Sequence, residues 1–156
     1  MYNNISPNVN FVEEEKKIEK FWSDAKIFEK SIESRREGEP YVFYDGPPTA
    51  NGKPHIGHVL TRVIKDMIPR YRTMKGYMVP RKAGWDTHGL PVELEVEKLL
   101  GLDGKEQIEE YGLEPFIDHC KESVWKYKGM WEDFSKTVGF WADMNDPYVT
   151  YDNNFI

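Results

Sequence analysis

Two short apolar runs, with a loop and a long helical pattern between them, occupy residues 41–83. Residues 41–44 are aromatic and β-branched, which predicts a buried strand, and residues 77–80 are predicted to form a second strand. Residues 45–54 contain three Pro and two Gly and form a loop of defined shape, whereas residues 56–74 show helical periodicity. A strand–helix–strand unit of this kind joins two parallel strands by a right-handed crossover. The expected fold class is therefore α/β.

Further helices are expected on both sides of this unit. Residues 10–34 are interpreted as one helix, with Asn10 and Glu13 placed as an N-terminal capping box. A helix is also predicted over residues 91–101, because it begins with proline and ends with glycine. Residues 139–156 are aromatic without a regular pattern, and we expect them to be irregular.

Two helices carry specific expectations. Pro69 should kink the helix over residues 56–74, because proline removes a backbone donor, and Gly76 should end it. Residues 115–138 are predicted to form one amphipathic helix, and Cys120 on its apolar seam is interpreted as an inert buried thiol. The seam, interpreted as core packing, consists of Ile117, Cys120, Val124, Tyr127, Trp131, Phe134 and Val138.

The composition excludes several classes of protein. A net charge of −6 argues against a generic basic surface for nucleic acid. The single cysteine, Cys120, excludes an intramolecular disulfide framework and a zinc site made of thiolates alone. No apolar run approaches the roughly 20 residues of a membrane span, and residues 1–10 lack the pattern of a signal peptide. We therefore expect a cytoplasmic protein without a membrane partner.

Two loops rich in glycine and histidine leave the predicted strands at the same place. Residues 46–58 follow the first strand and residues 84–89 follow the second. Because the carboxyl ends of parallel strands meet at one edge of a sheet, these loops should face one crevice, where ligands of open α/β sheets bind.

The residues of these loops suit a nucleotide. His55 and His58 stand at the start of the helix, where free N–H groups and the helix dipole attract anions. Gly57 between them lets a flat ligand approach the backbone closely. Asp86 in the second loop can hold an ammonium group or simply stabilise its own turn.

Other interpretations of the histidine pair stay open. A P-loop would need one residue fewer before Lys53 and a Ser or Thr where Pro54 stands. His55 and His58 could bind a metal ion if His88 or a carboxylate supplied a third ligand. The pair could also do no more than cap the helix.

Residues 55–58 resemble the HIGH signature of class I aminoacyl-tRNA synthetases. The flanking residues 46–52 and the second loop with its continuation, residues 84–91, extend this resemblance to the isoleucine-specific members of the family. The resemblance runs along essentially the whole chain.

The resemblance implies a two-step reaction. ATP activates isoleucine to isoleucyl-adenylate with release of pyrophosphate, and the acyl group then passes to the 3′ end of tRNA(Ile). His55 and His58 are implied as catalytic residues at the ATP phosphates. The implied ATP contacts are Thr49, Asn51, His55, Gly57 and His58. The implied isoleucine site is formed by Gly46, Pro47 and Asp86, with Asp86 on the α-ammonium group. Mg²⁺ is expected to arrive with ATP, and this segment is expected to hold no zinc or other resident metal.

On this resemblance, residues 1–40 form an N-terminal helical extension. Residues 41–156 form the first half of a Rossmann-like, HUP-type parallel nucleotide-binding sheet that stops before the editing insertion. No segment resembles Lys-Met-Ser-Lys-Ser, the second ATP signature of the family. The chain is therefore expected to carry half of an ATP site and to be inactive or very weak alone.

Two other functions stay open, namely a non-catalytic binding module derived from a synthetase and a different nucleotidyltransferase with a His-x-Gly-His loop. For the complete enzyme we expect a cytoplasmic monomer. For the isolated chain we expect marginal stability and aggregation, because surfaces meant for the missing half would be exposed.

Overall fold

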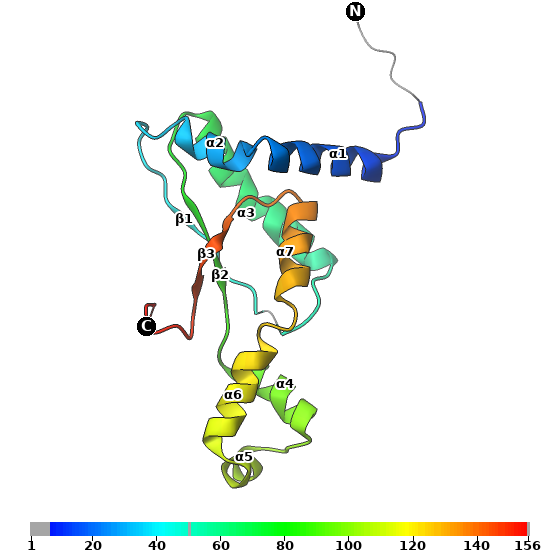
Figure 1. The fold of residues 1–156 in the computed structure, drawn as a ribbon, viewed down its shortest axis with the longest axis vertical. Coiled ribbons are helices and arrows are strands. Elements are labelled where there is room, and N and C mark those ends of the chain that lie inside the picture. The colour runs from blue at the N-terminus through cyan, green and yellow to red at the C-terminus, as the bar shows by residue number, and fades with distance from the viewer. Residues whose placement is uncertain (1–6, 50, 156) are drawn as a thin grey trace, which may run out of the picture.

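The computed structural model describes residues 7–49 and 51–155. Three parallel strands form one sheet in the order β1-β2-β3 (Figure 1). The strands are β1 (Phe43–Tyr44), β2 (Arg81–Trp85) and β3 (Asp143–Val149). Helix α3 (Ile56–Met74) connects β1 to β2. The predicted α/β class and the parallel strand–helix–strand unit are confirmed.

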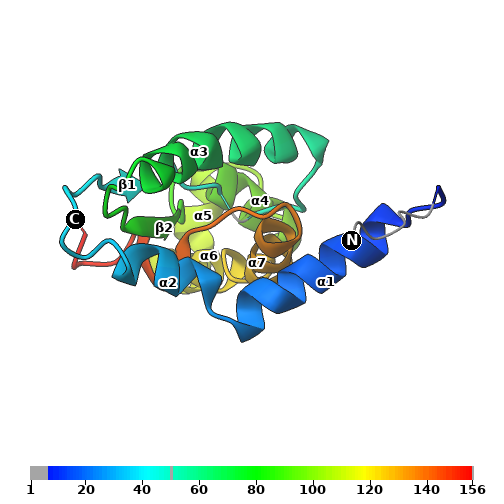
Figure 2. The same ribbon diagram turned by 90° about the horizontal axis from the view of Figure 1, so that it is seen from above.

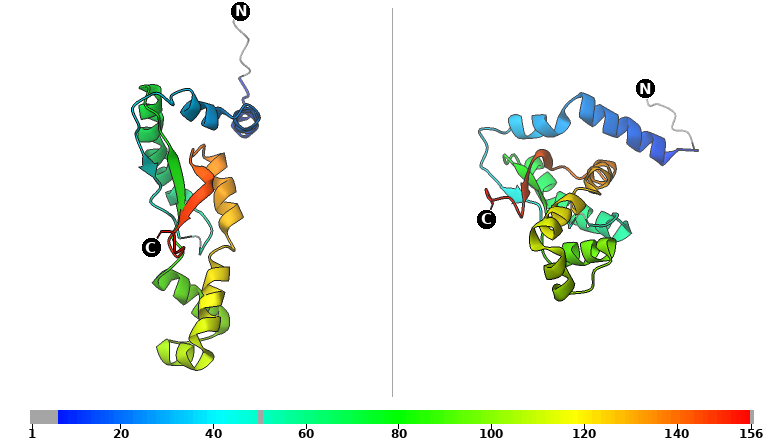
Figure 3. Two further views of the ribbon diagram at one scale, coloured as in Figure 1. Left: turned by 60° about the vertical axis from the view of Figure 1, so that its left-hand side comes forward. Right: turned by 60° about the horizontal axis from the view of Figure 1, so that its bottom comes forward.

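The other helices lie around this sheet. They are α1 (Phe11–Asp24), α2 (Ile27–Glu33), α4 (Leu90–Leu100), α5 (Lys105–Tyr111), α6 (Leu113–Ser123) and α7 (Lys128–Thr137). Figure 1 shows α1 and α2 near the ends where the strands begin, and α4, α5 and α6 beyond the ends where they finish. Figure 3 shows this second group projecting from the sheet, and Figure 2 shows α7 between α3 and α1. No helix within the described ranges is long and apolar enough to cross a bilayer.

Two strand predictions need correction. Residues 77–80 were expected to be the second strand, but within them only Met78 forms a bridge, to Pro40, and β2 begins at Arg81. Arg81 is buried by tertiary contacts that no hydrophobicity pattern reveals. The expected burial of residues 41–44 is also wrong. Val42 and Tyr44 are 62% and 60% exposed, because β1 forms one edge of the sheet.

The third strand, β3, lies in residues predicted to be irregular. Its register against β2 shifts between Lys82, which pairs with Asp143, and Gly84, which pairs with Tyr148. Pro147 lies in this irregular stretch, where the missing N–H does not interrupt a regular ladder. The prediction failed because an Asn-Asp-Pro sequence is typical of turns.

The two long helices predicted at either end of the chain are each divided. The N-terminal one breaks between α1 and α2 at Lys26, whose φ of 50° is left-handed. Asn10 caps α1, because its side chain accepts the Glu13 N–H at 3.4 Å, which is one half of the predicted capping box. The second divides into α6 and α7 around Trp125, and only part of its seam is core, since Val124 is fully buried but Ile117 is 47% exposed.

The predicted ends of two helices agree with the structure. The helix α4 ends at Gly101 in a left-handed conformation, as expected. Helix α3 is continuous through the buried Pro69, and the kink expected there stays a prediction. The helix ends just before Gly76, whose φ is 96°. Cys120 is half-buried, and its burial raises the pKa of the thiol, in keeping with an unreactive cysteine. Helix α5 lies in a stretch for which no element was predicted.

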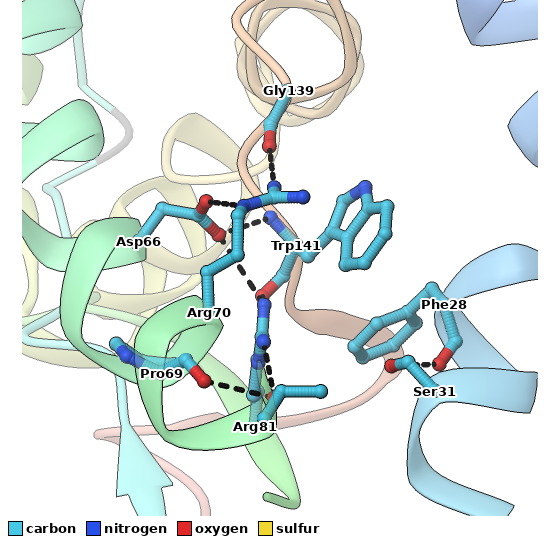
Figure 4. Close-up of polar contacts among 9 residues, drawn as sticks. Phe28, Ser31, Asp66, Pro69, Arg70, Arg81, Gly139 and Trp141 are labelled. Atoms are coloured by element: carbon cyan, nitrogen blue, oxygen red, sulfur yellow. Dashed lines mark hydrogen bonds and ion pairs between the residues drawn. The ribbon is translucent and has the colours of Figure 1, made fainter. Parts of the chain in front are cut away.

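Polar side chains join α3 to the sheet (Figure 4). Arg81 of β2 is 2% exposed and donates to the Thr73 hydroxyl at 3.0 Å, and it lies 3.3 Å from the Asp66 carboxylate. Asp66 also accepts from Arg70 and from the Trp141 N–H. Burial lowers the pKa of Arg81 to about 10. This network occupies the place that an apolar helix face usually takes against a sheet.

The apolar face of α3 points away from the protein instead. Eight of its large apolar side chains are 44–83% exposed: Ile56, Leu60, Val63, Ile64, Met67, Ile68, Tyr71 and Met74. The expectation that the chain exposes large apolar surfaces is confirmed at this helix.

Candidate active site

The two loops predicted to share a crevice meet at the carboxyl edge of the sheet. Thr49 of the first loop forms an isolated parallel bridge with Asp86 of the second, and its hydroxyl donates to Asp86 Oδ2 at 2.9 Å. The Asp86 N–H donates to the Pro48 carbonyl at 3.1 Å. Asn51 Nδ2 donates to the Pro91 carbonyl at 3.1 Å. The predicted meeting of the loops is therefore confirmed by two hydrogen bonds to Asp86, and a third joins the first loop to the start of α4.

His55 and His58 form a reciprocal cap at the start of α3. His55 Nδ1 accepts the Gly57 N–H at 3.1 Å, and His58 Nδ1 accepts the His55 N–H at 3.0 Å. The two ring centroids lie 3.8 Å apart. A Cβ at Gly57 would lie 2.9 Å from His55 Cε1, so glycine makes room for this ring. The histidine pair therefore caps the helix, as one of the interpretations from the sequence held.

The cap also decides which nitrogen can bind a ligand. A ring nitrogen that accepts an N–H carries no proton, so in the neutral form each of these rings carries its proton on Nε2. Burial of the His58 ring is the main cause that lowers its pKa. The charges of His55, Arg62 and Lys65 lower the same pKa further. At neutral pH His58 is therefore a neutral hydrogen-bond donor through Nε2.

A pocket of about 350 Å³ opens beside this cap. Its described lining contains one histidine and three cationic side chains but no carboxylate. The lining residues are Gly46, Pro48, Thr49, Asn51, Gly52, Lys53, His58, Thr61, Arg62, Lys65 and Trp131. In a chain whose net charge is −6, this local excess of positive charge favours an anionic ligand.

A buried carboxylate below the pocket organises two of these cations. Asp45 is 2% exposed, and its Oδ1 lies 2.8 Å from Lys65 Nζ while its Oδ2 lies 3.6 Å from Arg62 Nη1. Lys65 also donates to the Gly46 carbonyl at 2.6 Å. Burial lowers the pKa of Arg62. The three groups leave a net positive charge at the pocket and hold the first loop at its start.

Both loops contact β3 or the residue that follows it. The Tyr148 hydroxyl donates to the Asp45 carbonyl at 3.0 Å, and burial raises the pKa of this tyrosine. A Cβ at Gly84 would lie 2.3 Å from the Tyr148 ring, so only glycine allows the ring to lie there. His88 Nδ1 lies 2.6 Å from the Thr150 hydroxyl.

The structure brings some predicted site residues together and leaves others at the margin. Gly46, Thr49, Asn51 and His58 line the pocket. His55 stacks on His58 from outside this lining, and Gly57 is exposed at the helix start. Pro47 and Asp86 do not line the pocket, although Asp86 is tied to it through Thr49. Within residues 7–49 and 51–155, no three His, Cys, Asp or Glu side chains could hold one metal ion.

Comparison with known proteins decides the family. A model of the family described as tRNA synthetases class I (I, L, M and V) matches residues 17–156. The chain belongs to this family. The isoleucine–tRNA ligase of Clostridium kluyveri is 66% identical over 156 residues, and that of Clostridium novyi is 63% identical. Each alignment covers 100% of this chain and 15% of the relative, so the chain spans 15% of the length of these relatives.

A solved class I structure has a similar fold. LeuRS of Agrobacterium radiobacter K84, in a ternary complex with tRNA and LeuAMS, superimposes with a TM-score of 0.61 and 20% identity. The match covers 90% of this chain and 16% of that one. At this identity the likeness shows the fold alone, and it agrees with the class I synthetase sheet expected from the sequence.

Several residues of this candidate site, Arg62, Lys65, Asp45 and Trp131 among them, were not predicted as site residues. Arg62 and Lys65 line the pocket, and they follow His58 at helical spacing, so periodicity from the histidine carried a signal for them. Asp45 is the first residue of the loop and was interpreted only as part of it. Trp131 lines the pocket from α7, and nothing in the sequence connects it with the loops.

Proposed function

We propose that the complete protein is an isoleucine–tRNA ligase. It would activate isoleucine with ATP and transfer the isoleucyl group to tRNA(Ile). The observation that carries this proposal is the pocket at the start of α3, which His58 and three cations line without a described carboxylate. Both clostridial relatives described above are isoleucine–tRNA ligases.

The geometry suits a triphosphate next to the cap. The phosphate oxygens would be contacted by the Nε2 protons of His55 and His58 and by the cations of the pocket. The isoleucine carboxylate attacks the α-phosphorus, a new oxygen–phosphorus bond forms, and the bond to the β-phosphate breaks to release pyrophosphate. Negative charge grows on the phosphate oxygens in the transition state. Donors aimed at such charge typically contribute about 100- to 1,000-fold in rate.

Asp86 would hold the α-ammonium group of isoleucine. The Thr49 hydroxyl fixes one of its oxygens, and the Asp86 backbone is held by Pro48. Gly46 and Pro47 lie in the first loop, close in sequence to Thr49. Their backbone would therefore form a wall of the amino-acid site. This arrangement would place the isoleucine carboxylate between Asp86 and the pocket that takes the phosphates.

Other parts of the proposal depend on chain beyond this segment. Mg²⁺ would enter bound to the ATP phosphates, since no described carboxylate lines the pocket to hold it. The tRNA would be bound mostly by other domains. We propose that the complete enzyme works in the cytoplasm as a monomer.

Isoleucine-dependent exchange between ATP and pyrophosphate tests this function in the complete protein. The variant with both His55→Ala and His58→Ala is expected to lose at least about 100-fold in exchange rate. His119→Ala is the control, because this histidine lies on α6 and bonds Tyr111 away from the pocket. Two results would contradict the proposal. Exchange that does not require isoleucine would favour another nucleotidyltransferase, and no exchange in the unaltered protein would favour a binding module.

A further inference from the structure

Trp131 stands where three parts of the site meet. It belongs to α7, is 3% exposed and forms the apolar core cluster with Trp85, the residue directly before Asp86. Its sequence pattern indicates nothing beyond core packing. In the structure, the same side chain also lines the pocket.

The indole makes two directed contacts with the site. Its Nε1–H donates to the Gly52 carbonyl at 2.8 Å, across 79 residues of sequence. The His58 ring meets the indole edge-to-face, with centroids 4.7 Å apart. One rigid side chain therefore touches the end of the first loop and one ring of the histidine cap.

Helix α7 is itself held against α3 by a buried cation. The Arg62 guanidinium lies 5.4 Å from the Trp131 ring, 5.7 Å from Phe134 and 4.6 Å from Phe140. Arg62 is 4% exposed, and its charge is paired with Asp45 at 3.6 Å. The attraction between this cation and the three rings favours one placement of the indole relative to α3.

We propose that Trp131 is a positioning residue of the nucleotide site, which holds the Gly52 end of the first loop in register with His58. This inference rests on the proposed function for its ligand, ATP. It assigns Trp131 no contact with isoleucine, because the Asp86 and Gly46 parts of the site are held by Thr49 and Lys65 instead.

The test is Trp131→Phe in the complete protein, with Trp125→Phe as the matched control. Both changes keep an aromatic ring and remove one indole hydrogen bond, but the Trp125 bond goes to the Tyr151 hydroxyl away from the pocket. We expect Trp131→Phe to raise the KM for ATP about three- to tenfold, as for one lost hydrogen bond. Trp131→Phe should change the KM for isoleucine by less than about twofold. Trp125→Phe should change both the KM for ATP and the KM for isoleucine by less than about twofold.

A second variant protects the test against loss of folding. Benzothienylalanine at position 131 keeps the bicyclic shape of tryptophan but lacks the N–H, and it should raise the KM for ATP by the same factor. The positioning role is overturned if the substitutions at 131 and 125 change the KM for ATP equally. It is also overturned if Trp131→Phe changes the KM for ATP and the KM for isoleucine equally.

Direct calorimetry with ATP separates this inference from the proposed function. If the unaltered protein shows no exchange but binds ATP, the proposed function fails, and a weaker ATP affinity of Trp131→Phe alone still supports the positioning role. Equal ATP affinities of the two variants overturn it. Absence of ATP binding to the unaltered protein overturns both.

Discussion

At the scale of single residues, His55 and His58 each use one ring nitrogen to cap α3. Each Nδ1 accepts a backbone N–H of the helix start, so under the proposed function Nε2 would be the nitrogen that donates to a phosphate. Gly57 is required in this arrangement for a reason other than ligand access. Its missing side chain leaves the space in which the His55 ring folds back on the helix.

Gly57→Ala tests this requirement by its effect on stability. An alanine in place of glycine inside a helix usually stabilises by about 1 kcal/mol. Here the new Cβ would push the His55 ring out of its cap, and a lost N-cap costs about 1 kcal/mol. We therefore expect no net gain in the free energy of unfolding of the 156-residue chain, measured by urea denaturation.

Gly129→Ala in α7 is the matched control. A Cβ at Gly129 would meet nothing within 4 Å, so we expect the usual gain of about 0.5–1 kcal/mol. An equal gain from Gly57→Ala would show that the His55 ring is not confined by Gly57.

At the scale of secondary-structure elements, α3 has the reverse of the usual polarity. Asp66 and Thr73 contact Arg81 of the sheet, and Arg70 contacts Asp66 (Figure 4). The large apolar side chains of α3 are exposed. The orientation of α3, and with it the histidine cap at its start, depends on a charge network with Asp66 at its centre.

Asp66→Asn is expected to destabilise the chain by about 3–5 kcal/mol, because it leaves the buried Arg81 and the half-buried Arg70 without a carboxylate. Asp133→Asn is the control, since that side chain is 80% exposed and its pair with Lys136 should contribute less than about 0.5 kcal/mol. Urea midpoints of both variants check the difference. Similar midpoints would mean that α3 is held to the sheet by something other than this network.

At the scale of the whole molecule, the outward apolar face of α3 decides how the isolated chain behaves in solution. Met67 and Met74 are 58% and 72% exposed and belong to the continuous apolar face described above. A surface of this kind is a liability for self-association. This chain spans 15% of the length of the matched relatives.

Met67→Lys with Met74→Lys should reduce self-association of the 156-residue chain without lowering its stability by more than about 0.5 kcal/mol, because exposed side chains contribute little to folding. Sedimentation velocity at several concentrations measures the association. Lys16→Met, Glu19→Met serves as the reverse control on α1, where it should increase association. A monomeric unaltered chain at all concentrations would contradict the prediction.

The fold and the site were predictable to different extents. The parallel unit and the meeting of the two loops followed from the positions of Pro and Gly and from the direction of parallel strands. The cap was one of the open interpretations of the histidine pair. The breaks at Lys26 and near Trp125 did not, because apolar periodicity continues through both. The strand β3 was missed because its pairing with β2 overrides the turn preference around Pro147.

What the sequence determined by itself is local: the cap at Asn10, the end of α3 before Gly76, the presence of a loop after the first strand and the placing of two histidines at a helix start. These depend on interactions within a few residues, which composition and spacing describe. The tertiary structure alone decided that Thr49 bonds Asp86, that the apolar face of α3 is exposed and that Trp131 reaches Gly52. Such contacts join residues far apart in sequence, so they exist only once the whole chain has packed.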